Sequence, residues 1–304
     1  MPARSLPQWI GASALTCFIL ACGRPDTDLE FKQTTQPPLA VWSYRDLADS
    51  DSEQQAFFTF AARRGIRELY LGGAELLPRH AGALGSFLEA AQARGIRVSL
   101  VLGRAAWTRP AQRQAALEAV RAVRDFDQAQ VQAGRVRLTA LQLDVEPHTL
   151  PDWERDGTKL AAQYLDLLGD VKHELAGALP LQVAIPVWWH GRPIKYAGRT
   201  RPLSEWAIHL SDRTVLMDYR NQVDGVLKGA AGPLASAKEL GKPVVVGLAV
   251  HCDKDPENAS TSFCRLGEGA LQKVLRKTQP RLSRQPAFAG FAIFTYEDWD
   301  ILKR

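Results

Sequence analysis

The sequence contains few cysteines and lacks the short motifs that define several common enzyme classes. Of its 304 residues, four are cysteine and two are methionine. It has no glycine-rich phosphate turn, no P-loop, no His-Glu-x-x-His, no Gly-x-Ser-x-Gly and no long-period repeat. These absences argue against nucleotide-binding proteins, zinc proteases, serine hydrolases and solenoids. We therefore expect neither a cofactor nor a metal ion.

Charge of one sign is not concentrated anywhere in the chain. Hydrophobic residues make up 46% and charged residues 23%, which is an ordinary globular composition, and the formal net charge is +5. The basic side chains are spread through amphipathic stretches, as at Arg63, Arg94 and Arg121, so nucleic acid is not an expected partner. The length favours one domain of barrel size, and we expect a monomer.

The N-terminal apolar run is too short to span a bilayer. It extends from Trp9 to Ala21 behind Arg4 and is typical of a secretory signal peptide, residues 1–21. The end of this run, Ile-Leu-Ala-Cys22-Gly, resembles the lipobox of bacterial lipoproteins, with Ile where Leu is more usual. That resemblance implies cleavage before Cys22, lipidation of Cys22, and a tether over residues 22–38 that links a membrane to a domain at residues 39–304. A plain secreted protein cut nearby is the alternative.

The remaining cysteines favour an oxidising compartment. With Cys17 in the signal peptide and Cys22 lipidated, Cys252 and Cys264 are left, and they bracket one short loop. An even pair in an exported protein predicts a disulfide, which restricts the unfolded chain. A metal-binding pair is the alternative, but the C-x-x-C spacing of such sites is missing. We expect a membrane-anchored protein in the periplasm or at the cell surface.

From Leu39 onward, short apolar runs alternate with amphipathic stretches, which predicts βα units and a parallel sheet. Strands are expected at residues 39–44, 66–71, 96–102, 137–146, 181–187, 214–219, 244–250 and 288–294, and helices at 52–64, 84–94, 110–131, 158–175, 232–240 and 267–277. Eight strands with intervening helices predict a (β/α)8 barrel of the α/β class. An open doubly wound sheet is the alternative, but the first strand is not followed by the glycine-rich turn that such a sheet needs.

The fourth predicted strand ends in two acids. Its sequence, Arg-Leu-Thr-Ala-Leu-Gln-Leu-Asp144-Val-Glu146-Pro-His, alternates so that Leu141 and Leu143 share one face while Gln142, Asp144 and Glu146 share the other. Two carboxylates on one face at a strand tip are costly unless they meet water, a cation or a ligand. The pair therefore predicts a functional site, and a solvated strand end is the alternative.

Aromatic and charged side chains also follow the other predicted strands, at the end of the barrel where such folds place their sites. A sugar has flat apolar C–H faces and a rim of hydroxyls, so a cleft of Trp and Tyr with some charge predicts a carbohydrate ligand. The alternative is that several of the aromatic residues cap the core. The candidate substrate-binding residues are Trp42, Tyr44, Trp107, Trp188, Trp189, Asp218, Arg220, Tyr296 and Glu297.

Three of these strands resemble motifs of family 18 glycoside hydrolases, the chitinase-like (β/α)8 enzymes. Asp144-Val-Glu146 matches the end of Asp-x-x-Asp-x-Asp-x-Glu, with Thr139 and Gln142 in place of the earlier acids. Met-Asp-Tyr219 is similar to the Met-x-Tyr motif, with Arg220 where Asp is expected. On the last strand, Gly290-Phe-Ala-Ile-Phe294 has the family's glycine-started pattern but lacks its terminal Trp. The same segments also resemble uncharacterised bacterial hydrolase-like barrel lipoproteins.

The resemblance implies an enzyme in which Glu146 is the general acid, Asp144 assists a substrate acetamido group that attacks the anomeric carbon, and Tyr219 holds the acetamido oxygen. Competition between the two carboxylates for ionisation would keep a proton on one of them. A two-glutamate retaining mechanism would need Glu297, because the seventh strand ends without a Glu. A glycan-binding barrel without turnover is a rival interpretation, and metal binding by Asp144, Glu146 and His148 is a further one.

Overall fold

The computed structural model describes residues 38–73, 77, 80–252 and 260–303. The chain divides into two units, residues 1–35 and 36–304, and all described residues belong to the second. The predicted signal peptide, Cys22 and all but the last residue of the predicted tether lie outside the described residues. Within the part that is described, no helix is both long and apolar enough to cross a membrane.

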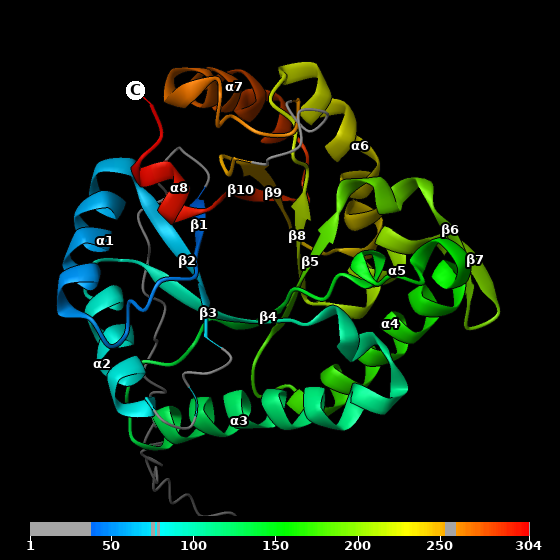
Figure 1. The fold of residues 1–304 in the computed structure, drawn as a ribbon, viewed down its shortest axis with the longest axis horizontal. Coiled ribbons are helices and arrows are strands. Elements are labelled where there is room, and N and C mark those ends of the chain that lie inside the picture. The colour runs from blue at the N-terminus through cyan, green and yellow to red at the C-terminus, as the bar shows by residue number, and fades with distance from the viewer. Residues whose placement is uncertain (1–37, 74–76, 78–79, 253–259, 304) are drawn as a thin grey trace, which may run out of the picture. The chain divides into compact units, whose positions relative to one another are not determined.

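Eight parallel strands close into a barrel, so the predicted (β/α)8 fold is confirmed (Figure 1). Around the barrel the order is β1-β10-β9-β8-β5-β4-β3-β2, which closes because β1 pairs with both β2 and β10. The bounds are β1 Leu39–Ser43, β2 Ile66–Gly72, β3 Arg97–Leu102, β4 Ala140–Leu143, β5 Leu181–Pro186, β8 Arg213–Met217, β9 Val244–Ala249 and β10 Phe288–Phe294.

The helices surround the barrel and bury their apolar faces against the outer side of the strands (Figure 1). This outer layer holds most of the hydrophobic core, including Leu141 and Leu143 of β4, as their alternation predicts. The bounds are α1 Asp51–Arg64, α2 Ala81–Gln92, α3 Arg113–Gln132, α4 Trp153–Leu175, α5 Leu203–Leu210, α6 Val223–Leu240, α7 Gly267–Leu282 and α8 Tyr296–Asp300.

A second, smaller apolar cluster fills the interior of the barrel, around Trp42 and Tyr70. Deeper inside, toward the strand starts, fully buried Glu68 accepts hydrogen bonds from Arg213 at 2.7 and 2.9 Å and from Arg97 at 3.1 Å. A buried carboxylate is tolerated when it is paired in this way. The interior is thus packed, and the opposite end, where the strands finish, is left for a site.

Several segments differ from the sequence prediction. Strand β4 covers only residues 140–143 of the predicted 137–146, so Asp144 and Glu146 lie beyond the strand, and the unpredicted helix α8 follows β10. Helix α6 begins at Val223, nine residues before the predicted start at Gly232, because glycines and Pro233 weaken the helical signal. Those glycines have a packing role: a Cβ on Gly229 or Gly232 would lie within 2.4 Å of the side chain of Asp218 or His190. In addition, the β6–β7 hairpin (Pro193–Tyr196, Arg199–Pro202) and α5 follow β5, where no element was predicted.

Candidate active site

Asp144 and Glu146 lie just beyond β4, where the chain leaves the barrel wall. The Asp144 amide donates a hydrogen bond to the Leu102 carbonyl of β3 at 2.9 Å. Gly103, the residue after β3, comes so close that a Cβ atom on it would lie 1.8 Å from the Asp144 carbonyl oxygen. Only glycine permits this approach, which fixes the backbone that carries the first acid.

The two carboxyl groups lie in surroundings that favour their protonated forms. Burial, and then the charge of Glu146, raises the pKa of Asp144 to about 7. Its Oδ1 atom is buried without a hydrogen-bond partner. Burial also raises the pKa of Glu146, whose side chain is 35% exposed. Among the described residues, no Lys or Arg lies within ion-pair distance of either group. The pair can therefore retain a proton where ordinary carboxyls are ionised.

His148 is a basic residue close to Glu146, but it is uncharged near neutral pH. Its Nε2 atom lies 4.0 Å from Glu146 Oε1, but burial lowers the pKa of His148 to about 4, so the ring is neutral near pH 7. Its ring is enclosed edge-on by Trp188 at 5.3 Å, Trp189 at 6.0 Å and Trp153 at 6.3 Å. Trp188, 44% exposed, is the member of this group that a ligand can reach.

Tyr219, just beyond β8, lies near the two acids. Burial, followed by the charges of Asp144, Tyr44 and Glu146, raises the pKa of its hydroxyl, so the hydroxyl lies within the electrostatic field of both carboxyls. Its neighbour Asp218 points to the other side of the wall, toward α6. Successive residues at the end of a strand point in opposite directions. Tyr219 therefore lies at the site, and Asp218 lies behind it.

Phe294, which was not among the predicted site residues, connects the aromatic rings at this end of the barrel. Its ring lies 5.8 Å from Tyr219, 5.9 Å from Trp42 and 6.2 Å from Tyr44. It ends β10, the position at which the family pattern has Trp, and a cis peptide bond joins it to Thr295. The sequence signal was therefore available. We call the surface formed by Tyr44, Asp144, Glu146, Tyr219 and Phe294 the mouth.

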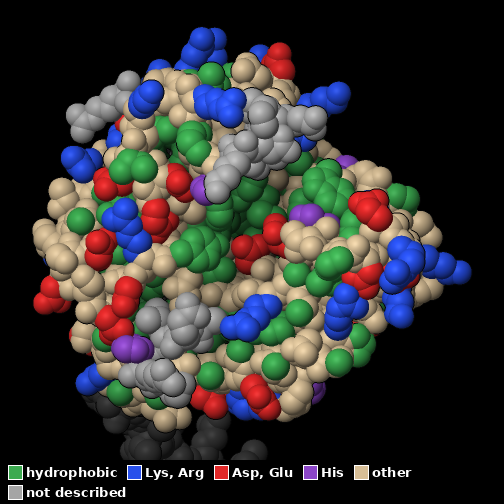
Figure 2. Space-filling view, in the orientation of Figure 1, with side chains coloured by type: hydrophobic (Ala, Val, Ile, Leu, Met, Phe, Trp, Pro, Cys, Tyr) green, Lys and Arg blue, Asp and Glu red, His purple; other side chains and the backbone are tan. Residues whose placement is uncertain are grey.

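Figure 2 shows a hollow in the molecular surface, with hydrophobic side chains inside it and acidic side chains beside it. Inside the barrel, fully buried Trp42 donates its indole N–H to Gln142 Oε1 at 2.7 Å, and Gln142 in turn donates to Gln182 at 3.4 Å. These contacts explain why Gln142 departs from the family pattern: a neutral amide can both accept and donate inside the barrel, which a carboxylate cannot.

Four predicted substrate-binding residues lie away from the mouth. Trp107, Trp189 and Tyr296 are at most 5% exposed and belong to the outer core, where Tyr296 packs between Phe57 and Phe60 of α1. Asp218 is fully buried against α6. These three aromatic side chains pack in the core and do not line the mouth, as the alternative interpretation of the sequence had it.

Glu297 and Arg220 make contacts that stabilise the rim. A single oxygen of Glu297 accepts hydrogen bonds from the Ser43 hydroxyl at 2.6 Å and from the amides of Tyr44 at 2.8 Å and Arg45 at 3.1 Å. Glu297 thereby fixes the end of β1, next to Tyr44. Because three donors already bind this oxygen, Glu297 is poorly suited to act as a nucleophile. Arg220 donates to the Tyr219 carbonyl at 3.0 Å.

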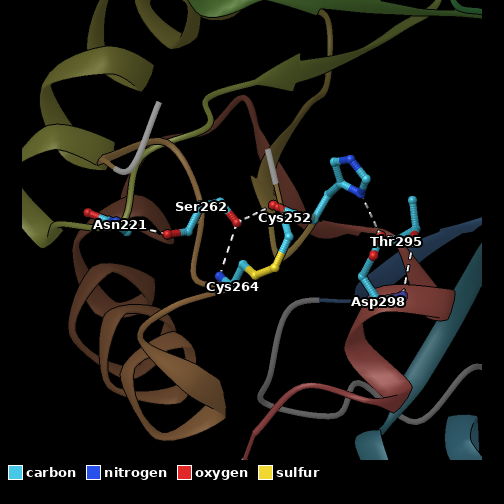
Figure 3. Close-up of a disulfide and its surroundings, with 7 residues drawn as sticks. Asn221, Cys252, Ser262, Cys264, Thr295 and Asp298 are labelled. Atoms are coloured by element: carbon cyan, nitrogen blue, oxygen red, sulfur yellow. Dashed lines mark hydrogen bonds and ion pairs between the residues drawn. A yellow bond between two sulfur atoms is a disulfide. The ribbon is translucent and has the colours of Figure 1, made fainter. Parts of the chain in front are cut away.

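Cys252 and Cys264 form the predicted disulfide, close to the mouth (Figure 3). Cys252 follows His251, whose ring lies 6.1 Å from Phe294. Within the described residues, no group of three or more His, Cys, Asp or Glu side chains is arranged to hold a metal ion. The arrangement of Asp144, Glu146 and His148 thus does not support metal binding by these three residues.

No protein-family model and no curated protein sequence matches the chain. Solved structures match it by fold. A chitinase from Bacteroides thetaiotaomicron aligns with a TM-score of 0.53 at 12% identity over 86% of this chain and 90% of that chain. An endo-β-1,4-mannanase from Thermotoga petrophila aligns with a TM-score of 0.55 at 13% identity over 86% and 68%. An exo-β-1,4-mannosidase from Opitutaceae bacterium strain TAV5 aligns with a TM-score of 0.52 at 12% identity over 86% and 52%. What this chain shares with these enzymes is the (β/α)8 barrel fold.

Proposed function

We propose that the protein is a glycoside hydrolase that acts on a glycan at the cell envelope. The observation that carries this proposal is the pair Asp144 and Glu146, which lies in the mouth near Tyr219 and Tyr44 and makes no ion pair with a Lys or Arg of the part of the chain that the structure describes. A carboxyl group whose pKa is raised by burial, as in Glu146, is suited to donate the proton that glycosidic bond cleavage needs, and aromatic rings suit the C–H faces of sugars.

In the proposed reaction, Glu146 donates its proton to the glycosidic oxygen as the bond to the leaving sugar breaks. The carbonyl oxygen of the substrate's own acetamido group attacks the anomeric carbon, and Asp144 stabilises the positive charge that develops on that group. The Tyr219 hydroxyl donates a hydrogen bond to the acetamido oxygen. Water then completes hydrolysis, with Glu146 recovering a proton from it. No second protein nucleophile is required, which agrees with the hydrogen bonds that occupy Glu297.

The second candidate function is a barrel that binds a glycan without turnover. Gln142 favours it, because this amide occupies the place of an acid in the family pattern and is held by Trp42 at 2.7 Å. Such a protein would keep the aromatic surface of the mouth while its acids had no reaction to support. The two candidates differ in whether a bound glycan is cut.

We further propose that the protein is exported and attached to a membrane through lipid on Cys22. The support is the signal-peptide pattern at residues 1–21 and the disulfide, which belongs to an oxidising compartment. A Cys22→Ala variant should leave the membrane fraction or remain unprocessed. Partitioning identical to that of the unchanged protein would contradict the anchor.

The test of the proposed activity is a screen of the purified protein against chitin oligosaccharides, peptidoglycan and β-1,4-mannan, with release of reducing ends as the readout. We expect activity on a substrate that carries acetamido groups. Binding without release of reducing ends would favour the second candidate. Neither binding nor release with any of the three would contradict both.

A further inference from the structure

His251, directly after β9, is held more firmly than an exposed side chain requires. It is exposed, with 56% of its side chain accessible. Its amide donates to the Phe294 carbonyl at 3.3 Å, and its carbonyl accepts from the Ser262 hydroxyl at 2.6 Å. The next residue, Cys252, is bonded to Cys264, and the Cys264 amide donates to the same Ser262 hydroxyl at 3.1 Å. Figure 3 shows the disulfide and the contacts of Ser262 beside it.

The imidazole ring is oriented as well. Its Nδ1 atom lies 3.1 Å from Oδ2 of Asp298, and the same oxygen accepts a hydrogen bond from the Thr295 hydroxyl at 2.7 Å. A neutral imidazole that donates from Nδ1 to a carboxylate has an unprotonated Nε2, which is a hydrogen-bond acceptor. The contact with Asp298 therefore leaves Nε2 as the hydrogen-bond acceptor of the ring.

The ring also borders the mouth. It meets Phe294 edge-on, with 6.1 Å between ring centres and 79° between planes. Phe294 also contacts Tyr219 and Tyr44, so its ring links His251 to the other aromatic residues of the mouth. A sugar ring lying on Phe294 would present its rim of hydroxyls toward His251.

We propose that His251 is a saccharide-binding residue whose Nε2 accepts a hydrogen bond from a hydroxyl of the sugar that lies on Phe294. Asp298 is a positioning residue that fixes the accepting edge, and the disulfide with Ser262 holds the backbone. Fixing an exposed side chain costs conformational entropy during folding. A ligand that contacts the fixed side chain does not have to meet this ordering cost when it binds. This inference rests on the proposed function and adds a contact apart from Asp144 and Glu146.

The test compares two substitutions that keep different parts of the histidine. In His251→Gln the amide reaches about as far as Nε2, whereas in His251→Asn it reaches only about as far as Nδ1 and can satisfy Asp298 alone. The probe is tetra-N-acetylchitotetraose, titrated calorimetrically into full-length mature protein that carries Glu146→Gln to prevent turnover. We expect His251→Ala and His251→Asn to raise Kd roughly 5- to 10-fold, and His251→Gln to raise it less.

His209→Ala is the matched control, because this exposed histidine also lies edge-on to an aromatic ring, Trp206 at 6.3 Å, but on α5. It should leave Kd unchanged. A Kd that is the same in His251→Ala as in the parent, in protein that binds the tetrasaccharide, would overturn this inference and leave the proposed function standing. Retention of affinity by His251→Asn but not by His251→Gln would also overturn it, since only the tie to Asp298 would then matter. Failure of the parent protein to bind the probe would contradict this inference, whereas the proposed function would still be judged by the wider screen.

Discussion

A Cβ atom on Gly229 would lie 2.4 Å from Oδ1 of Asp218, so this carboxyl group is packed directly against helix α6. Both of its oxygens are buried without hydrogen-bond partners. Burial raises the pKa of Asp218 to about 7, although Arg220 acts in the opposite direction. In consequence, the folded state prefers the protonated form of this group, whereas the unfolded chain ionises it near pH 4.

Asp218→Asn should therefore stabilise the protein at high pH. The stability that protonated Asp218 allows is fully present below pH 4 and is lost as the pH rises through about 7. A pKa shift of this size lowers the free energy of unfolding at high pH by at most ~4 kcal/mol. Asn cannot ionise, so the variant does not lose this stability. We expect the free energy of unfolding in urea to increase in the variant at pH 8 and to change little at pH 4.5.

Asp125→Asn is the control for that experiment, because Asp125 is exposed on α3 and makes only a surface ion pair with Arg124. Its effect on stability should be small at both pH values. Equal destabilisation by Asp218→Asn at pH 4.5 and pH 8 would show that the group is not a buried acid with a raised pKa.

Gly103→Ala should disturb the site through the backbone. The added Cβ would meet the Asp144 carbonyl oxygen at 1.8 Å, so β3 and the end of β4 must separate. We expect a loss of stability of about 2 kcal/mol or more, measured as unfolding free energy, together with weaker catalysis. Gly169→Ala, in α4 with open space around the position, should be neutral or slightly stabilising. Equal effects of the two substitutions would contradict the close approach.

Glu146→Gln should lower the pKa of Asp144. The charge of Glu146 is the second cause, after burial, that raises this pKa to about 7. Gln carries no charge, so the Asp144 carboxyl should lose its proton at lower pH in the variant, as measured by carboxyl-carbon NMR. Asp218→Asn removes a carboxyl on the other side of the wall and should leave the Asp144 titration in place. An Asp144 titration that does not move in Glu146→Gln would show that the two acids are not coupled.

Much of the fold follows from local patterns in the sequence. The eight strands and most of the helices were predicted, because apolar runs of strand length alternate with amphipathic stretches that end in glycine, as at Gly65 and Gly241. The start of α6 was missed because Gly225, Gly229 and Pro233 oppose a helix locally. Tertiary packing against Asp218 overrides that preference.

The candidate site was predictable to the extent that it depends on where the strands end. Asp144, Glu146 and Tyr219 lie near one another because β4 and β8 finish at the same end of the barrel, although all three residues lie beyond the strands themselves. Sequence alone could not show that Trp189 and Tyr296 pack into the outer core, since an aromatic residue at a strand end can face either way. Nor could it pair His251 with Asp298, which is 47 residues away in the chain.

The central claim is that Glu146 donates the proton that cleaves a glycosidic bond. Glu146→Gln keeps the shape of the side chain and removes the proton that titrates, and Glu239→Gln, exposed on α6, is the matched control. The decisive measurement is kcat and Kd for both variants on a substrate that the unchanged protein cuts. We predict that Glu146→Gln lowers kcat by ~10²-fold or more with Kd largely preserved, and that Glu239→Gln changes neither. Hydrolysis that continues at the full rate in Glu146→Gln would contradict this account.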